Sequence, residues 1–293
     1  MAEQHPLRGI LLLFCSLFFF AALDATAKYL AQSYSVPLLV WARYCVHFLL
    51  MAVILGPRLG RSLIRTGNPR LVILRGLFLV GCTAFGVAAL ARMPLAETTA
   101  IAFTAPLLVA LLAGPLLGER LTPLRWGVVF IGFAGVLLIA RPEGGVTPSG
   151  AGLALGASAC FAAYQILTRR LAASESTLTL LFYTALSGSV VTSLALPFFH
   201  ADLVVPPPGD ALLICALGVL GGSGHFLLTW AFRHAPASLL SPFTYLQLVW
   251  ATLLGAAVFG HWPDALAFLG MAIIVAGGVV LAIRTAPANP ESR

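Results

Sequence analysis

The stretch MPLAETTA, residues 93–100, has a counterpart in the second half of the chain. It returns as APASLLSP at residues 235–242, a spacing of 142 residues from Pro94 to Pro236. The same spacing relates LGE (117–119) to FGH (259–261) and AGV (134–136) to AGG (276–278), and a spacing of 141 residues relates Gly9, Lys28 and Leu30 to Gly150, Arg169 and Leu171. A near-constant spacing over most of half the chain indicates two related halves.

The composition places both halves in a membrane. Hydrophobic residues make up 60% of the 293 residues and charged residues only 9%, whereas soluble domains carry about 25% charged residues. A soluble core cannot hide this much apolar surface, so lipid must cover it. We therefore expect a multi-pass protein of the cell (inner) membrane, in contact with lipid and without nucleic acid as a partner, despite the formal net charge of +7.

The chain divides into ten segments that can each cross the bilayer, because a spanning helix needs about 20 apolar residues. The expected spans are 9–31, 38–56, 71–92, 95–118, 123–140, 150–171, 177–199, 210–232, 238–260 and 264–284. The predicted fold class is thus all-α integral membrane, with a first five-helix repeat at 9–140 and a second at 150–284.

The basic residues predict the orientation of these spans. With a cytoplasmic N-terminus, the outer segments carry only Lys28, Arg92 and Arg141, Arg43 lies within a span, and the remaining arginines, Arg75 among them, lie on the inner side. Basic residues accumulate on the cytoplasmic side, so both termini are expected there. Because five is an odd number of spans, the second repeat is inverted, and inverted repeats operate by alternating access around a site between them.

Other function classes lack their motifs. Lys28 stands in ATAKY without a nearby glycine, so the chain contains no Walker A motif for ATP. The longest connecting segments, 57–70 and 141–150, hold no acid pair and no Ser/His/Asp set, so the chain is not expected to be an enzyme. Neither a metal site nor a cofactor is predicted, since the histidines lack ligand spacing. The cysteines, which are Cys15, Cys45, Cys82, Cys160 and Cys215, are expected to be reduced, packed thiols.

A family resemblance rests on the repeated stretch. PLAETTAI (94–101), running on to LGERLTP (117–123), closely resembles the EamA repeat of the drug/metabolite transporter superfamily, and residues 235–242 to 259–260 are similar. The second copy departs at His261, where the usual glutamate is absent. The resemblance implies a basket-like ten-helix fold and the transport of small organic solutes, most often outward. We favour export of neutral or aromatic amino acids, as in the YddG type; the alternative is another metabolite, such as a nucleoside-like cofactor of the S-adenosylmethionine or riboflavin type, or a cationic drug.

Ionisable residues within the spans are candidates for function, because charges in hydrocarbon are costly and usually face a cavity or a partner. Asp24 and Lys28, four apart on one helix, either neutralise each other or leave Asp24 to bind substrate or a proton. Arg43 can hold a substrate carboxylate, reach the outer surface, or pair with Glu97 or Asp24. Glu97 either complements the N-terminus of a helix or binds an amine or a proton.

Aromatic and polar residues near mid-depth complete the predicted substrate site. Besides Arg43 and Glu97, its members are Tyr44, Thr83, Phe85, Phe103, Tyr164, Gln165, His225, Trp230 and Tyr245. An aromatic pocket with few polar groups suits a zwitterion with an apolar side chain or a flat cation, although each aromatic can equally serve in packing. Phe103 and Tyr245 stand at equivalent places in the two repeats and suggest paired walls. His225, after the stretch GGSG (221–224), is either a packing histidine or a third proton-coupling candidate with Asp24 and Glu97.

The remaining features concern helix packing. Gly127, Gly132 and Gly135 in the fifth span, and Gly270, Gly277 and Gly278 in the tenth, predict closely packed helices; the protein is either a homodimer through them or a monomer. Pro106, Pro115 and Pro242 predict kinks or moving hinges in the fourth and ninth spans. Trp126 and Trp262 are expected at the membrane interfaces.

Overall fold

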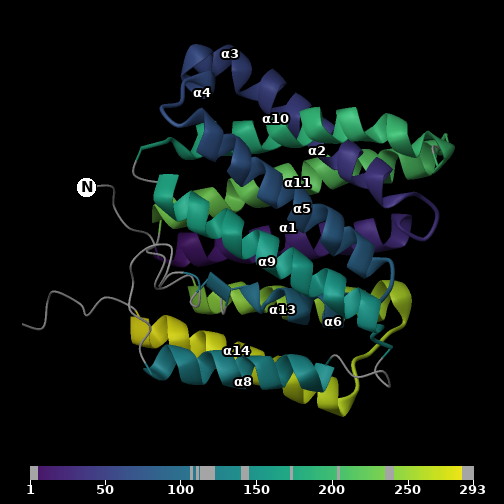
Figure 1. Ribbon diagram of the computed structural model, residues 1–293, viewed down its shortest axis with the longest axis vertical. Coiled ribbons are helices and arrows are strands. Elements are labelled where there is room, and N and C mark those ends of the chain that lie inside the picture. The colour runs from purple at the N-terminus through teal and green to yellow at the C-terminus, as the bar shows by residue number, and fades with distance from the viewer. Residues whose placement is uncertain are drawn as a thin grey trace, which may run out of the picture.

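The computed structural model describes residues 6–105, 108–109, 112, 123–139, 145–171, 174–202, 205–234 and 241–285. Within these residues, helices are the only regular elements (Figure 1). In chain order they are α1 (Pro6–Leu30), α2 (Val36–Ile54), α3 (Gly56–Leu59), α4 (Arg61–Ile64), α5 (Pro69–Leu90), α6 (Leu95–Ala102), α8 (Pro123–Ile139), α9 (Pro148–Leu171), α10 (Thr177–Ala195), the 3-10 helix η2 (Leu196–Asp202), α11 (Pro208–His234), the 3-10 helix η3 (Ser241–Tyr245), α13 (Leu246–Phe259) and α14 (Ala265–Thr285).

Proline and glycine mark several of the helix ends. The helices α5, α9 and α11 begin at Pro69, Pro148 and Pro208, where the missing N–H costs nothing and the fixed φ suits a helix. Helix α13 ends at Gly260, which has φ 66° and donates its N–H to Ala256 O at 3.0 Å. A left-handed residue directly after a helix is the usual glycine stop, so these boundaries follow from the local sequence.

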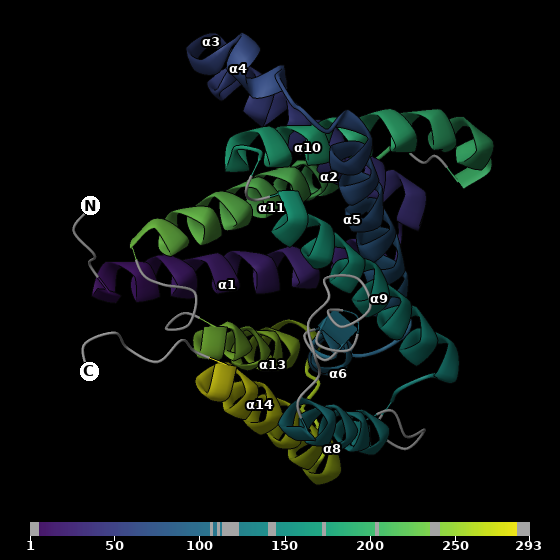
Figure 2. The same cartoon turned by 60° about the vertical axis from the view of Figure 1, so that its left-hand side comes forward.

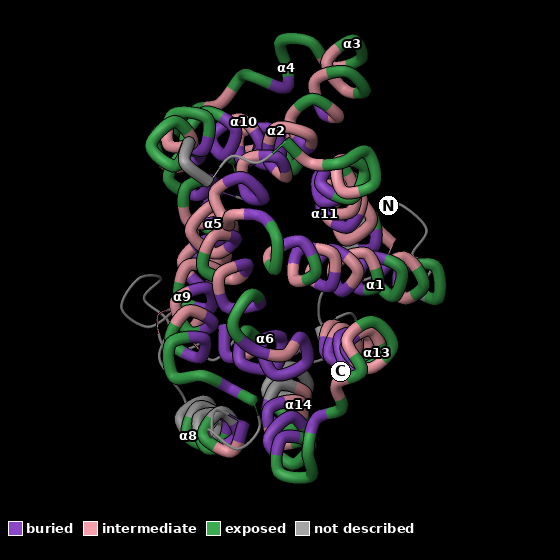
Figure 3. The backbone as a smooth tube through the Cα atoms, turned by 90° about the vertical axis from the view of Figure 1, so that its right-hand side faces the viewer, coloured by how far each residue is buried: buried purple, intermediate pink, exposed green. Residues whose placement is uncertain are grey.

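Six of the described helices are long and apolar enough to cross a membrane. They cover Leu7–Leu30, Val36–Ile54, Pro69–Leu90, Pro148–Thr168, Thr177–Phe199 and Pro208–Leu228, and shorter apolar helices cover Phe130–Ile139, Phe243–Phe259 and Ala265–Gly277. Large apolar side chains face outward from the long helices, including Val53 at 70%, Leu194 at 69% and Leu212 at 72% exposure. Figure 3 shows such exposed positions along the outer faces of the helices. The protein is therefore an all-α, multi-pass membrane protein.

The helices pack in a pattern that is the same for both halves. The repeat spacing pairs α1 with α9, α2 with α10, α5 with α11, α6 with α13, and α8 with α14. Helix α1 packs against α11 as α9 packs against α5, and α2 packs against α11 as α10 packs against α5 (Figures 1 and 2). Helix α13 packs against α1 as α6 packs against α9. Three contacts join equivalent helices of the two halves, namely α2 with α10, α6 with α13, and α8 with α14. Exchanging the halves therefore reproduces these most extensive helix contacts.

Glycine permits the closest of these contacts. A Cβ on Gly135 of α8 would lie 2.9 Å from the Gly270 carbonyl oxygen of α14, and one on Gly270 would lie 2.6 Å from the Gly135 carbonyl oxygen. This confirms that the fifth and tenth spans are packing helices. Gly76 of α5 and Gly218 of α11, one repeat spacing apart, similarly allow α10 and α2 to approach.

Helix α5 connects two polar ends of the bundle. At its beginning, Glu175 Oε1, between α9 and α10, accepts hydrogen bonds from Thr66 Oγ1 at 2.7 Å and from the Gly67 N–H at 2.9 Å. At its end, Lys28 Nζ donates to Leu90 O at 2.9 Å and to Met93 O at 2.7 Å. The rise of an α-helix puts the ends of a helix of this length roughly 30 Å apart, which is about the thickness of the hydrocarbon layer.

A further hydrogen bond ties the connection before α2 to the start of α11. Tyr34 OH donates to Asp210 Oδ2 at 2.6 Å. This bond to a carboxylate raises the pKa of Tyr34 to about 12, because the anionic neighbour disfavours loss of the phenolic proton.

Arg75, one of the arginines expected on the inner side, has its side chain buried within the bundle. Its side chain is 3% exposed, and the guanidinium donates to Thr168 Oγ1 at 2.6 Å, Thr184 Oγ1 at 2.7 Å, Leu180 O at 2.9 Å and Tyr164 OH at 2.6 Å. It also lies over the Tyr164 ring, 4.2 Å from the centroid. Neutral oxygen atoms of α9 and α10 thus satisfy a buried cation on α5, and they join the two halves near the start of α5.

The predicted kinks are described in part. Pro106 and Pro115 lie outside the described residues, although α6 already ends at Ala102. Pro242 lies within η3, whose tighter 3-10 turn precedes α13. The ninth predicted span therefore begins with a change of helix type close to its proline, consistent with the lost backbone donor.

Replacing Gly135 by valine should destabilise the protein by about 1–3 kcal/mol, because the new side chain would overlap the Gly270 carbonyl. Thermal unfolding in detergent measures the effect. Gly127→Val is the matched control, since a Cβ at Gly127 on the same helix meets nothing within 4 Å. Equal melting temperatures for the two variants would contradict the packing described.

Replacing Arg75 by lysine should also destabilise the protein, by about 1–3 kcal/mol, because an ammonium cannot reach acceptors that lie in the directions of a guanidinium fork. Arg70→Lys, at an exposed position of the same helix, should change stability by less than about 0.5 kcal/mol. Thermal unfolding of both variants, monitored by size-exclusion chromatography, distinguishes a buried network from a surface arginine.

Candidate functional site

An acidic and a basic side chain lie near each other between α1 and α2. Asp24 of α1 and Arg43 of α2 are half-buried and close enough to interact electrostatically. The one hydrogen bond to the Asp24 carboxylate in the described part of the chain comes from Gln247 Nε2 of α13, at 3.5 Å. That distance is at the long limit for a hydrogen bond, so the carboxylate keeps most of its accepting capacity.

The Arg43 guanidinium is less satisfied still. Among the described residues it has no hydrogen-bond acceptor, and its closest ring contact is the Tyr44 ring, 5.8 Å from the centroid. Gly221 of α11 faces it, since a Cβ there would lie 3.4 Å from Arg43 Nε. The Arg75 guanidinium makes four hydrogen bonds, whereas the Arg43 guanidinium makes none to the described residues. The N–H groups of Arg43 are therefore available to bind an anion.

Two histidines lie beside this arginine. The rings of His47 on α2 and His225 on α11 stack with their centroids 6.5 Å apart and an interplanar angle of 5°, and the Phe20 ring meets His225 edge-on at 5.0 Å. Gly222 and Gly224 make room for them, because added Cβ atoms would lie 3.2 Å from His47 Cδ2 and 2.7 Å from Phe20 Cε1. The GGSG stretch therefore allows close approach, as predicted from the sequence.

Sequence reasoning missed His47 as a member of this cluster. His47 stands four residues after Arg43, which places both side chains on the same face of a helix. This spacing was the available signal, but it gains meaning only when α2 is known to face α11.

The hydroxyl groups of Tyr44 and Thr83 form a hydrogen bond with each other. Tyr44 OH and Thr83 Oγ1 are 2.9 Å apart, and Thr83 Oγ1 also donates to Leu79 O at 2.9 Å. The Tyr44 ring is 1% exposed and lies against Gly188 of α10, where a Cβ could not fit. These two predicted site residues thus join α2, α5 and α10 at the edge of the cluster.

Other predicted site residues lie elsewhere. Tyr164 belongs to the Arg75 network, and Gln165 follows it on α9 with a half-buried side chain. Phe85 is 42% exposed beside Gly156 of α9 and, two residues after Thr83, points to the other side of α5. Trp230 is 37% exposed near the end of α11, with Arg8 over its ring at 5.6 Å. Trp262, in the connection between α13 and α14, is 62% exposed. Exposed tryptophans near helix ends suit an interfacial belt; Trp126 lies outside the described side chains.

The predicted pair of Phe103 and Tyr245 is in contact. Their ring centroids are 5.1 Å apart at an interplanar angle of 37°, and both rings pack in an apolar cluster that includes Ile101 and Leu248. The equivalence seen in the sequence therefore corresponds to a direct contact between the two halves. The contact fills the space between the rings, so the pair forms a packed wall.

Glu97 and Lys28 lie at the far end of α5 from Arg75. Glu97 is 0% exposed, and its Oε1 is 3.0 Å from His261 Nε2. Lys28 is bound by the carbonyl oxygens of Leu90 and Met93 and lies 5.3 Å from the centroid of the Phe259 ring. Its charge is therefore satisfied by α5 and by an aromatic face rather than by Asp24.

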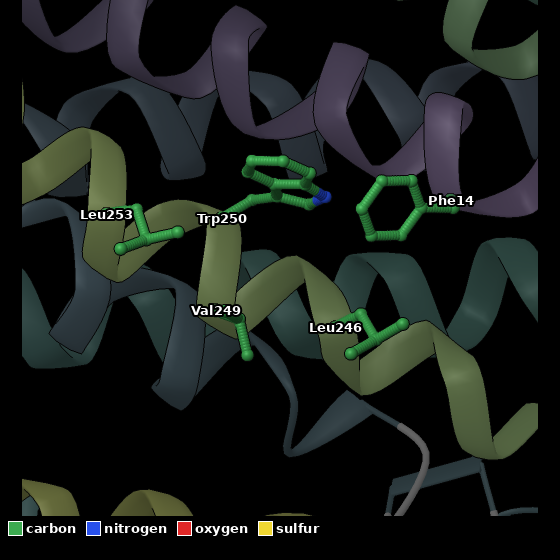
Figure 4. Close-up of a pocket in the computed structure, with 5 residues that line it drawn as sticks. All are labelled: Phe14, Leu246, Val249, Trp250 and Leu253. Carbon is green, nitrogen blue, oxygen red and sulfur yellow. The ribbon is translucent and has the colours of Figure 1, made fainter.

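An apolar groove between α1 and α13 provides a contrast with this polar cluster. It encloses about 200 Å³ and is lined by Phe14, Leu246, Val249, Trp250 and Leu253 (Figure 4). The Trp250 Nε1–H, the polar group in this lining, has no hydrogen-bond partner in the described chain. Such a surface suits hydrocarbon and gives a charged solute nothing to bind.

The five cysteines are free thiols. Cys15 and Cys215 are exposed, so the expectation of packed thiols fails at these two positions. Both lie on helices whose outer faces are apolar, where an exposed thiol contacts lipid at little cost.

The cluster around Arg43 can therefore bind opposite charges at separate points. Arg43 and the His47 imidazole offer donors for an anion, while Asp24 and the Gln247 amide oxygen offer acceptors for an ammonium. Phe20 supplies an apolar surface beside them. A small zwitterion matches this arrangement.

Comparison with known proteins identifies the family to which the chain belongs. The pattern of the EamA-like transporter family matches residues 7–141 and again residues 148–283. The S-adenosylmethionine uptake transporter of Rickettsia bellii is 30% identical over 217 residues, which cover 74% of this chain and 73% of that protein. The pseudopaline exporter of Pseudomonas aeruginosa is 29% identical over 278 residues, covering 93% of this chain and 95% of that protein.

Two further matches extend over nearly the whole chain. The riboflavin transporter of Vibrio cholerae is 27% identical over 279 residues, covering 93% of this chain and 92% of its own. A solved crystal structure superimposes with a TM-score of 0.66 at 25% identity, covering 94% of this chain and 98% of the other. The family pattern, present twice, spans most of the sequence, and the protein therefore belongs to the EamA-like transporter family of the drug/metabolite transporter superfamily.

Proposed function

We propose that this transporter moves a small zwitterionic solute across the cell inner membrane by alternating access between its two family units, with ten spans and both termini in the cytoplasm. The symmetric list of packed helix pairs supports two inverted units at 9–140 and 150–284. The exposed arginines Arg58, Arg61 and Arg65 gather on and beside α3 and α4, at the end of the bundle that this orientation places in the cytoplasm.

The observation that carries the solute class is the unsatisfied Arg43 guanidinium near the weakly bound Asp24 carboxylate. Charges buried in a membrane protein persist where they serve a partner, and a solute with one carboxylate and one ammonium provides both partners. Neutral and aromatic amino acids fit this description, with Phe20 and the imidazoles of His47 and His225 beside the side chain. Export of such amino acids is our leading proposal.

The second candidate is a larger metabolite that carries the same head group. S-adenosylmethionine has an α-amino and an α-carboxyl group, and a relative 30% identical to this chain is named for its uptake. Riboflavin, for which another relative is named, lacks both charges. The site chemistry therefore favours amino acids and S-adenosylmethionine over riboflavin, and the direction of transport is a separate outcome of the assay.

Flux into and out of proteoliposomes tests this proposal. Labelled phenylalanine, threonine, methionine, S-adenosylmethionine and riboflavin are compared with and without a pH gradient, which also tests Asp24, Glu97 and His225 as proton-coupling groups. At least one solute with both charges should be transported, and its amide and its N-acetyl derivative should compete roughly 10–100-fold more weakly, because each loses a charge-assisted hydrogen bond. Equal competition by these derivatives would contradict the zwitterion site.

Substitutions at the two charges should reproduce the effect of the derivatives. Arg43→Gln and Asp24→Asn should each lower flux at low solute concentration roughly 10-fold or more. Trp262→Ala, at an exposed position, and Arg92→Gln, an exposed arginine bound to Ala88 O, should retain flux close to that of the unmodified protein. Uniform losses in all four variants would remove the assignment of the site and leave the fold untouched.

A further inference from the structure

Glu97 is a buried carboxylate with half of its acceptors unused. It lies in the first turn of α6, and its side chain is 1% exposed. Oε1 is 3.0 Å from His261 Nε2, whereas Oε2 is buried and has no hydrogen-bond partner in the described chain. A buried carboxylate oxygen without a hydrogen-bond donor destabilises this conformation. Protonation of the carboxylate, or a movement that brings a donor to it, would remove that cost.

The partner histidine belongs to the other family unit. Glu97 lies in the unit at 7–141 and His261 in the unit at 148–283, in the connection between α13 and α14. The Glu97–His261 pair therefore holds together the two parts that must move relative to each other in alternating access. It lies at the Lys28 end of α5, roughly 20 Å along that helix from Arg75, and that end faces outward in the proposed orientation.

The surroundings of Glu97 leave few other charges to influence it. Lys28 of α1 is an electrostatic neighbour. Helices α5, α8, α9, α13 and α14 present apolar side chains to α6, namely Ala89, Ile139, Ala151, Ala154, Leu248, Ala267 and Met271. Asp264, in the same connection as His261, accepts a hydrogen bond from the Ala267 N–H at 2.8 Å at the start of α14. His261 is thus the group through which the surrounding solution can reach Glu97, because its side chain is 35% exposed.

We propose that Glu97 and His261 form a proton-controlled latch that closes one entrance of the transport path, the external one in the proposed orientation. A protonated imidazole makes a charge-assisted hydrogen bond to the carboxylate and holds the units together. Loss of that proton weakens the bond and frees the entrance to open. The Arg75 network at the opposite end contains only neutral acceptors and an arginine that stays charged, so acid does not strengthen or weaken that network in the same way.

The latch also accounts for the departure of this chain from the family pattern at residue 261. A glutamate there would place a second carboxylate against the buried Glu97, and the two would repel each other unless they shared a proton. A histidine provides an N–H donor, and its protonated form adds a positive charge to the contact. Histidine therefore replaces a pair of acids by a donor–acceptor pair whose strength depends on a proton.

Thiol labelling of a buried position beside the latch tests this inference, which rests on the alternating-access mechanism but does not need a known solute. In a full-length variant without its five native cysteines, Ala96→Cys places a thiol one residue before Glu97, where the native side chain is 1% exposed. The rate of labelling by a membrane-impermeant maleimide is measured in nanodiscs from pH 5 to pH 8. At each pH the rate is divided by that of the same protein carrying His261→Gln, which cancels the intrinsic reactivity of the thiol.

The normalised rate should fall about fivefold from pH 8 to pH 5, the difference between a neutral and a charge-assisted hydrogen bond. Glu97→Gln should abolish this change. His234→Gln, which removes a half-buried histidine bound to Trp230 O on α11, should leave the profile intact.

A normalised rate that does not vary with pH would overturn the latch, as would a Glu97→Gln profile equal to that of the unmodified pair. Failure of the proposed transport function is recognised separately, because it appears as absent flux for every solute while the labelling profile is unaffected. His261→Gln changes a partly exposed side chain, so a folded reference protein is expected.

Discussion

The structure depends on how a bundle surrounded by lipid satisfies its buried charges, because hydrocarbon offers them neither water nor counterions. Lys28 and Arg75 are bound by carbonyl and hydroxyl oxygens at opposite ends of α5. Both fix neighbouring helices in place. Arg43 and Glu97 differ, since one has no acceptor and the other has an unused oxygen in the described chain. The charged groups with full sets of hydrogen-bond partners hold the helices in place. The charged groups that lack partners mark the sites that we propose for binding solute and proton.

The same framework explains how the two units can move. Glycine contacts such as Gly76 with α10 and Gly218 with α2 bring helices of different units close together without large interlocking side chains. Small residues at such interfaces are typical of membrane helices. Charged side chains join the units at opposite ends of α5, through the Arg75 network and through the Glu97–His261 pair. Between these ends lies the cluster of Asp24, Arg43, His47 and His225.

Much of the fold could be predicted from the sequence because hydropathy and repeat spacing are local, additive signals. Six expected spans correspond to long apolar helices and three to shorter ones, whereas the span at 95–118 is described only in part. The glycine-rich spans pack as predicted at Gly135 and Gly270, and Phe103 meets Tyr245 as their equivalent positions suggested. The number of spans and the position of the termini stay predictions. The burial of Arg75 could not be predicted, because a residue near a helix end can face either water or the bundle, and only the rotation of α5 against α9 and α10 decides this.

The site was harder to predict because it depends on contacts between distant segments. Glu97 and His261 lie 164 residues apart in the sequence. The sequence alone therefore offered a helix N-terminus as a partner for Glu97 and showed His261 only as a position where the motif glutamate is absent. His47 went unnoticed because its stacking partner lies on α11. Phe85 and Trp230 have the right depth but face away from the cluster, since depth along a helix carries no information about the side on which a residue lies.

The most direct measurement is a structure of the protein determined with a transported solute bound. The account predicts that the carboxylate of the solute lies within hydrogen-bond distance of the Arg43 guanidinium, with its ammonium toward Asp24 and Gln247. A solute bound beside Arg75, or in the apolar groove of Phe14 and Trp250, with Arg43 still without an acceptor, would contradict it.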